Sequence, residues 1–116
     1  MNIDLWLKTS HLAWKNHNID RVLGLFTDKE LQYWETPYRL LESKPEIAKE
    51  WELIKKQENI TYEYSVFSSA KESHAIQFKI SYDQDSATKT FAGVYLIKLD
   101  SSGKCFYFLM AGEKNV

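Results

Sequence analysis

The spacing of the hydrophobic residues changes near residue 58 of this chain. Before that point apolar side chains recur every three to four residues, as on amphipathic helices, and from residue 60 to residue 113 they recur at every second residue, as on half-buried strands. The strand-like segments follow one another with turn residues between them, which predicts an antiparallel meander. Because the helices precede the strands and do not alternate with them, the pattern indicates an α+β domain whose helices cover one face of a curved sheet.

The helical half contains three segments with helical spacing. Two helices are expected over residues 4–17 and 19–26. A third begins at residues 43–46 (SKPE), which form a capping box with proline in the first turn. In this third helix the apolar stripe that contains Trp51 is expected to face the sheet.

The strands are delimited by turn residues and proline. A short strand is expected over residues 31–36, and it ends at Pro37, which cannot donate a hydrogen bond to a neighbouring strand. The last two long strands are apolar on both faces, so each face must contact other residues or a partner. The four long strands are expected over residues 60–68, 74–82, 88–99 and 104–113.

Length and composition restrict the classes of protein to consider. A chain of 116 residues fits one domain, residues 1–116, and its 15 Lys and Arg against 16 Asp and Glu leave a net charge of −1 without a basic patch. Nucleic acid is therefore not an expected partner. Aromatic residues make up 15% of the chain, more than an aliphatic core needs, so the rings are expected to line a core, a pocket or an interface.

The cysteine, the histidines and the hydropathy indicate the cellular compartment and argue against a reactive thiol and a metal site. Cys105 is the single cysteine, which suits a reducing compartment, and it has no basic neighbour in sequence that would make it a nucleophile. His11 and His17 would point away from each other on a helix, so neither a metal site nor a cofactor is expected. No apolar run approaches the roughly 18 residues of a membrane-spanning helix. We expect a cytoplasmic protein that does not bind membranes.

Several short motifs stand out along the chain: Asn18-Ile19-Asp20, Leu25-Phe26-Thr27-Asp28, Glu35-Thr36-Pro37, Ile47-Ala48-Lys49-Glu50-Trp51 and residues 93–108 (GVYLIKLDSSGKCFYF). With the predicted order of elements, they resemble the SnoaL-like branch of the nuclear transport factor 2-like superfamily over nearly the whole chain. The resemblance implies a cone-shaped fold of three N-terminal helices packed on a curved antiparallel sheet, with a pocket at the open end of the cone. It also implies a homodimer through the outer sheet face.

Glu35 is the candidate catalytic residue. In enzymes of this superfamily an acid near the end of the first strand, just before a proline, acts as general base, and the resemblance places Glu35 there. A carboxyl group held among aromatic rings in an apolar pocket would be suited to proton transfer near neutral pH. Tyr33 or Tyr38 could supply a hydrogen-bond donor beside it.

The candidate ligand-binding residues are aromatic or soft apolar side chains. Many of them carry a hydroxyl or an indole N–H, which is typical of a cavity for a flat, largely apolar ligand. They are Trp14, Tyr33, Trp34, Tyr38, Trp51, Tyr62, Phe78, Tyr95, Phe108 and Met110.

Three functions are compatible with these residues. The first is a domain that binds a small, largely apolar molecule without catalysis. The second is an acid–base isomerase, dehydratase or cyclase that uses Glu35. The third is a non-catalytic, dimeric interaction module that acts through its outer sheet face.

Overall fold

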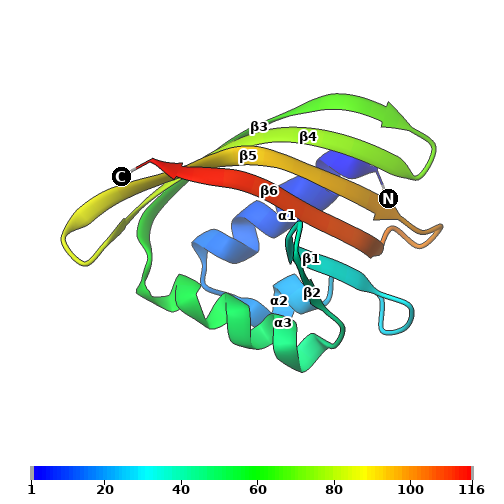
Figure 1. Ribbon diagram of the computed structural model, residues 1–116, viewed down its shortest axis with the longest axis horizontal. Coiled ribbons are helices and arrows are strands. Elements are labelled where there is room, and N and C mark those ends of the chain that lie inside the picture. Colours follow the sequence, from blue (N-terminus) through cyan, green and yellow to red (C-terminus); the bar gives the residue numbers. More distant parts are fainter. Residues whose placement is uncertain (1, 116) are drawn as a thin grey trace.

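Three α-helices cover one face of a six-stranded sheet in the computed structural model, which describes residues 2–115 (Figure 1). The sheet curves over the helices, and this confirms the predicted α+β class. The elements are α1 (Ile3–Lys15), α2 (Ile19–Leu23), β1 (Gln32–Thr36), β2 (Arg39–Leu41), α3 (Lys44–Trp51), the 3-10 turn η1 (Glu52–Lys56), β3 (Glu58–Ala70), β4 (Ser73–Gln84), β5 (Ala87–Leu99) and β6 (Cys105–Asn115).

The strand order is β2-β1-β6-β5-β4-β3. Strands β3 to β6 form the predicted antiparallel meander, whereas β1 pairs with β6 in parallel, so the sheet is mixed. The parallel pair arises because the chain between β1 and β6 contains α3 and four strands, and such a long connection can return in either direction. The hairpin strand β2 was not predicted, since three residues are too few to show a period.

Side-chain caps begin all three helices. The Asn2 side chain accepts from the Leu5 N–H at the start of α1, and Asn18 does the same for the Arg21 N–H at α2. At α3 the Ser43 hydroxyl accepts from the Glu46 N–H, so the predicted capping box is present.

Helix α2 is shorter than predicted because the chain turns to pair with the sheet. Residues 24–26 were expected to continue the helix, but Phe26 forms an isolated parallel bridge with Cys105. The Cys105 N–H donates to the Leu25 carbonyl oxygen, and the Thr27 N–H donates to the Cys105 carbonyl oxygen. A pairing between residues so far apart in sequence leaves no local signal.

A pair of glycines lies side by side on β5 and β6. Gly93 and Gly112 are register partners, and a Cβ atom on Gly93 would lie 2.1 Å from the carbonyl oxygen of Ala111. A Cβ atom on Gly112 would lie 2.7 Å from the ring of Phe91. Glycine is therefore required at both positions, and it lets the Phe91 ring lie over β6.

The helices of residues 2–115 are all too short or too polar to cross a membrane.

Candidate functional site

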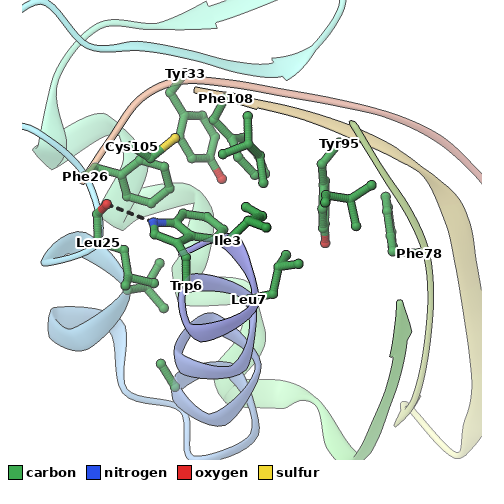
Figure 2. Packing of buried hydrophobic residues seen from close by; sticks show 14 of the residues in the cluster. Ile3, Trp6, Leu7, Leu25, Phe26, Tyr33, Phe78, Tyr95, Cys105 and Phe108 are labelled. Carbon is green, nitrogen blue, oxygen red and sulfur yellow. Dashed lines mark hydrogen bonds between the residues drawn. The ribbon is translucent and has the colours of Figure 1, made fainter. Parts of the chain in front are cut away.

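A cavity of about 480 Å³ lies between the helices and the inner face of the sheet. Helix α1 lines it with Trp6, Ser10 and Trp14, three residues at i, i+4 and i+8 that share one face of the helix. The sheet lines it with inward-facing side chains of β1, β3, β4, β5 and β6. Figure 2 shows how the rings of Tyr33, Phe108 and Tyr95 stand on the sheet opposite Trp6.

Tyr33 and Trp51 connect β1 to α3 across this space. The Trp51 indole N–H donates to the Tyr33 hydroxyl oxygen at 2.9 Å, and the Tyr33 ring stacks on Phe108 with centroids 4.9 Å apart. Tyr33 is only 3% exposed, and this burial raises the pKa of its hydroxyl well above the usual value. The group therefore remains a neutral phenol at physiological pH.

A pair of hydroxyls lies beyond Phe108, whose ring also contacts the Tyr95 ring. The oxygens of Tyr62 and Tyr95 are 2.6 Å apart, and the Tyr95 ring stacks on Phe78 with centroids 4.0 Å apart. Burial raises the pKa of Tyr62 and of Tyr95, so both are also neutral. The cavity thus carries three phenols that can donate hydrogen bonds and cannot act as bases near pH 7.

The other indole groups of the cavity wall are already satisfied. The Trp6 N–H donates to the Leu25 carbonyl oxygen at 3.1 Å, which Figure 2 marks with a dashed line. The Trp14 N–H donates to the Gln57 side-chain oxygen at 2.7 Å. These two rings offer a ligand apolar surface and no free donor.

Two carboxylates lie at the mouth of the cavity and share one arginine. The Arg39 guanidinium is 2.5 Å from Glu50 and 3.4 Å from Glu35, and the two carboxylate side chains are about a quarter exposed, 25% and 27% respectively. Glu35 is one of the residues that line the cavity, and its catalytic role remains a prediction. Its surroundings differ from the predicted apolar pocket, because β2 brings Arg39 back beside it.

Seven of the ten predicted ligand-binding residues line the cavity together. Five of them point inward from strands, and Trp14 and Trp51 come from helices α1 and α3, while their contact with a ligand remains a prediction. They are Trp14, Tyr33, Trp51, Tyr62, Tyr95, Phe108 and Met110.

The other three predicted residues lie elsewhere. Trp34 follows the inward-facing Tyr33 on β1 and therefore points to the outer face of the sheet. Tyr38 occupies the turn between β1 and β2 and is 97% exposed. Phe78 is buried against the Tyr95 ring and does not border the cavity. None of the three is part of the cavity wall.

Sequence reasoning missed Trp6, Ser10 and Gln57. The helical spacing of Trp6, Ser10 and Trp14 could have identified the first two. Gln57 follows η1 in a segment without periodicity, so only the structure reveals its bond to Trp14.

Cys105, His11 and His17 make structural contacts within the fold. Burial raises the pKa of the Cys105 thiol to about 12, and the thiol donates to the Tyr107 carbonyl oxygen at 3.0 Å, which fits an unreactive packed side chain. His11 packs on the Tyr62 ring with centroids 4.7 Å apart, and the His17 Nε2 atom is 2.7 Å from the Gln57 carbonyl oxygen. Within residues 2–115, no three metal-binding side chains lie together.

Comparisons with known proteins give structural matches only. No family model and no curated protein matches the sequence. Among solved structures, the epoxide hydrolase/cyclase-like enzyme SalBIII matches with a TM-score of 0.79 at 12% identity, over 95% of this chain and 89% of that one. Protein RV0760c of Mycobacterium tuberculosis, solved with estradiol-17beta-hemisuccinate, matches with a TM-score of 0.75 at 14% identity, over 91% and 89%.

A third match is itself described by the name of a fold. An NTF2-like protein of unknown function from Exiguobacterium sp. 255-15 has a TM-score of 0.74 at 14% identity, over 93% of this chain and 98% of that one. Matches of this extent at such low identity establish a shared fold. The chain therefore has the nuclear transport factor 2-like fold that its motifs and order of elements predicted.

Proposed function

We propose that this protein binds a small, largely apolar molecule in the cavity between its helices and its sheet. The observation that carries the proposal is the volume of about 480 Å³ within an aromatic wall, since ligand pockets usually measure roughly 300–1,000 Å³. The complex of RV0760c with a steroid derivative gives further support, because that protein has the same fold.

A neutral apolar fluorophore tests the proposal. N-phenyl-1-naphthylamine gains fluorescence when it enters an apolar site, and the purified protein should bind it saturably. Met110 borders the cavity, and the bulkier side chain of a Met110→Trp variant should weaken this binding. Glu113 lies three residues further along β6 and is exposed, so Glu113→Trp is the matched control and should bind as the wild type does. Equal binding by both variants would contradict the proposal.

The natural ligand can be sought directly. We expect a small apolar compound to remain with the protein through purification under native conditions. Extraction into organic solvent followed by mass spectrometry identifies it. The same extraction from Met110→Trp should yield less of the compound, whereas Glu113→Trp should yield the wild-type amount.

An acid–base isomerase, dehydratase or cyclase is the second candidate. It is supported by the position of Glu35 at the cavity mouth, two residues along β1 from the buried hydroxyl of Tyr33. The Arg39 ion pair weighs against it, because the guanidinium contacts a carboxylate oxygen of Glu35 that would have to accept the proton. Tyr38, the other donor considered, is too exposed to assist.

We also propose a homodimer through the outer sheet face, which is compatible with ligand binding and with catalysis. Val94 and Leu96 of β5 point outward, and each is 43% exposed. On the neighbouring strands, Leu109 and Trp34 are register partners and extend this apolar surface. Pairing two such faces about a two-fold axis would remove both from water. A cytoplasmic location also remains a prediction.

A further inference from the structure

We infer that the ligand of this cavity is a neutral molecule with a hydrogen-bond acceptor, such as a carbonyl oxygen, that accepts from the Tyr33 hydroxyl. The inference rests on the proposed binding function and adds the chemical class of the ligand. It depends on which polar atoms of the cavity wall remain free.

The Tyr33 hydroxyl has one proton and two lone pairs. The Trp51 N–H donates to one lone pair, so the hydroxyl acts as an acceptor in that bond and its own proton is not used. Among the described residues the proton has no acceptor. A buried donor without a partner is unfavourable, and a ligand oxygen would satisfy it.

The Tyr62 and Tyr95 hydroxyls leave a second donor. Two hydroxyl groups that share one hydrogen bond use one of their two protons, whichever oxygen donates. Phe108 lies between the two sites, because its ring contacts both Tyr33 and Tyr95, at centroid distances of 4.9 and 5.1 Å. Figure 2 shows the hydroxyls of Tyr33 and Tyr95 pointing to the same side, toward the helical layer. A flat ligand over Phe108 would therefore have a donor at each end.

The charges around the cavity favour a neutral acceptor over a carboxylate. Lys114, an exposed residue near the end of β6, is the one basic side chain in the described lining. At the mouth, Glu35 and Glu50 are both bound to Arg39, which leaves an excess of negative charge there. An anion would lose its hydration in the cavity, and the exposed Lys114 is the one cation of the described lining that could replace it.

Two probes that differ by one carbonyl test the inference. In 1-tetralone a carbonyl replaces one methylene group of tetralin, and the rest of the two molecules is the same. NMR titration of ¹⁵N-labelled protein measures both affinities. We expect 1-tetralone to bind about two- to tenfold more tightly than tetralin, the factor that one hydrogen bond contributes. The indole N–H signal of Trp51 should shift further with 1-tetralone, because its acceptor, the Tyr33 hydroxyl, then donates to the ligand.

Three variants separate the hydroxyl from the shape of the cavity. Tyr33→Phe should lose the preference for 1-tetralone and retain the affinity for tetralin. Trp51→Phe removes the donor to Tyr33 but keeps the Tyr33 hydroxyl, so the preference should persist. Tyr38→Phe alters an exposed hydroxyl and should bind as the wild type does.

The outcomes distinguish this inference from the binding function. Equal affinity of the wild type for the two probes, or a preference that survives in Tyr33→Phe, would overturn the inference and leave the binding function standing. Failure of both probes and of N-phenyl-1-naphthylamine to bind would overturn both. Tighter binding of the anion 2-naphthoate than of 1-tetralone would also overturn the assignment of a neutral ligand.

Discussion

The indole N–H of Trp51 donates to the hydroxyl of Tyr33 at 2.9 Å, and this bond joins α3 to β1 across the cavity. The Trp51 ring also meets the Trp14 ring of α1 edge-on, with centroids 5.0 Å apart. One side chain thus links helix α3 to two other elements of the cavity wall. It nevertheless remains partly exposed, unlike its neighbour Ile47 in the same helix.

Stability measurements should distinguish Trp51 from that neighbour. Ile47 is 0% exposed, so Ile47→Ala should lower the free energy of unfolding by about 2–5 kcal/mol. Trp51→Ala should cost less, about 1–2 kcal/mol, because the ring borders open space and its hydrogen bond contributes only about 1 kcal/mol. Urea denaturation of both variants measures the difference. A larger loss for Trp51→Ala than for Ile47→Ala would mean that the ring is packed as core.

A chemical probe tests Glu35 as a base. The flat aromatic 5-nitrobenzisoxazole opens when a base removes its ring proton. If the enzymatic alternative holds, the wild type should accelerate this opening and Glu35→Gln should lose about 10² or more of the acceleration, the usual contribution of a positioned base. Glu42→Gln, at an exposed carboxylate just after β2, is the matched control. No acceleration by the wild type, or an unchanged rate in Glu35→Gln, would count against a base at this position.

The fold was predictable because its signals are local. The change from helical to strand spacing, the capping box at Ser43 and the alternating faces of β4 lie within short segments of the chain. Contacts between distant segments left no such signal. Helix α2 ends early because Phe26 pairs with Cys105, and the short strand β2 forms only because a partner strand lies beside it.

The sequence predicted which types of residue form the candidate site, but not in which direction each side chain points. Tyr33 and Trp34 are adjacent on β1 and look alike in sequence, yet strand alternation places them on opposite faces of the sheet. A shift of one residue in register would exchange them. The Arg39 ion pairs with Glu35 and Glu50 depend on how β2 folds back on β1, so the sequence could not show that Glu35 is paired.

Mild acid should destabilise the protein through His11. Its Nε2 atom is buried without a hydrogen-bond partner in the part of the chain that the structure describes, and burial, followed by the charge of Lys15, lowers the pKa of His11 below 6.5. The unfolded chain therefore binds a proton more readily than the folded chain. The stabilising contribution is present above pH 6.5, and it is lost as the pH falls from there toward the lowered pKa.

Urea denaturation at pH 7 and pH 5 measures this dependence. We expect a smaller loss of stability between the two values in His11→Phe than in the wild type. Burial also lowers the pKa of His74, so His74→Phe should remove a further part of the loss. Asp28, Asp83 and Asp100 have lowered pKa values and titrate below this range, so they do not interfere. An unchanged pH dependence in His11→Phe would contradict the prediction.

Light scattering tests the proposed dimer. At micromolar concentration the wild type should have a mass twice that of the 13.7 kDa chain. Leu96→Lys places a charge in the middle of the apolar outer face and should give a monomer, because the charge would be buried without a partner at a two-fold interface. Glu63 lies on the same face but on the edge strand β3, so Glu63→Lys is the control and should leave the mass unchanged. A wild type that is monomeric at these concentrations would reject the dimer, and Val94 and Leu96 would then be exposed apolar residues of a single chain.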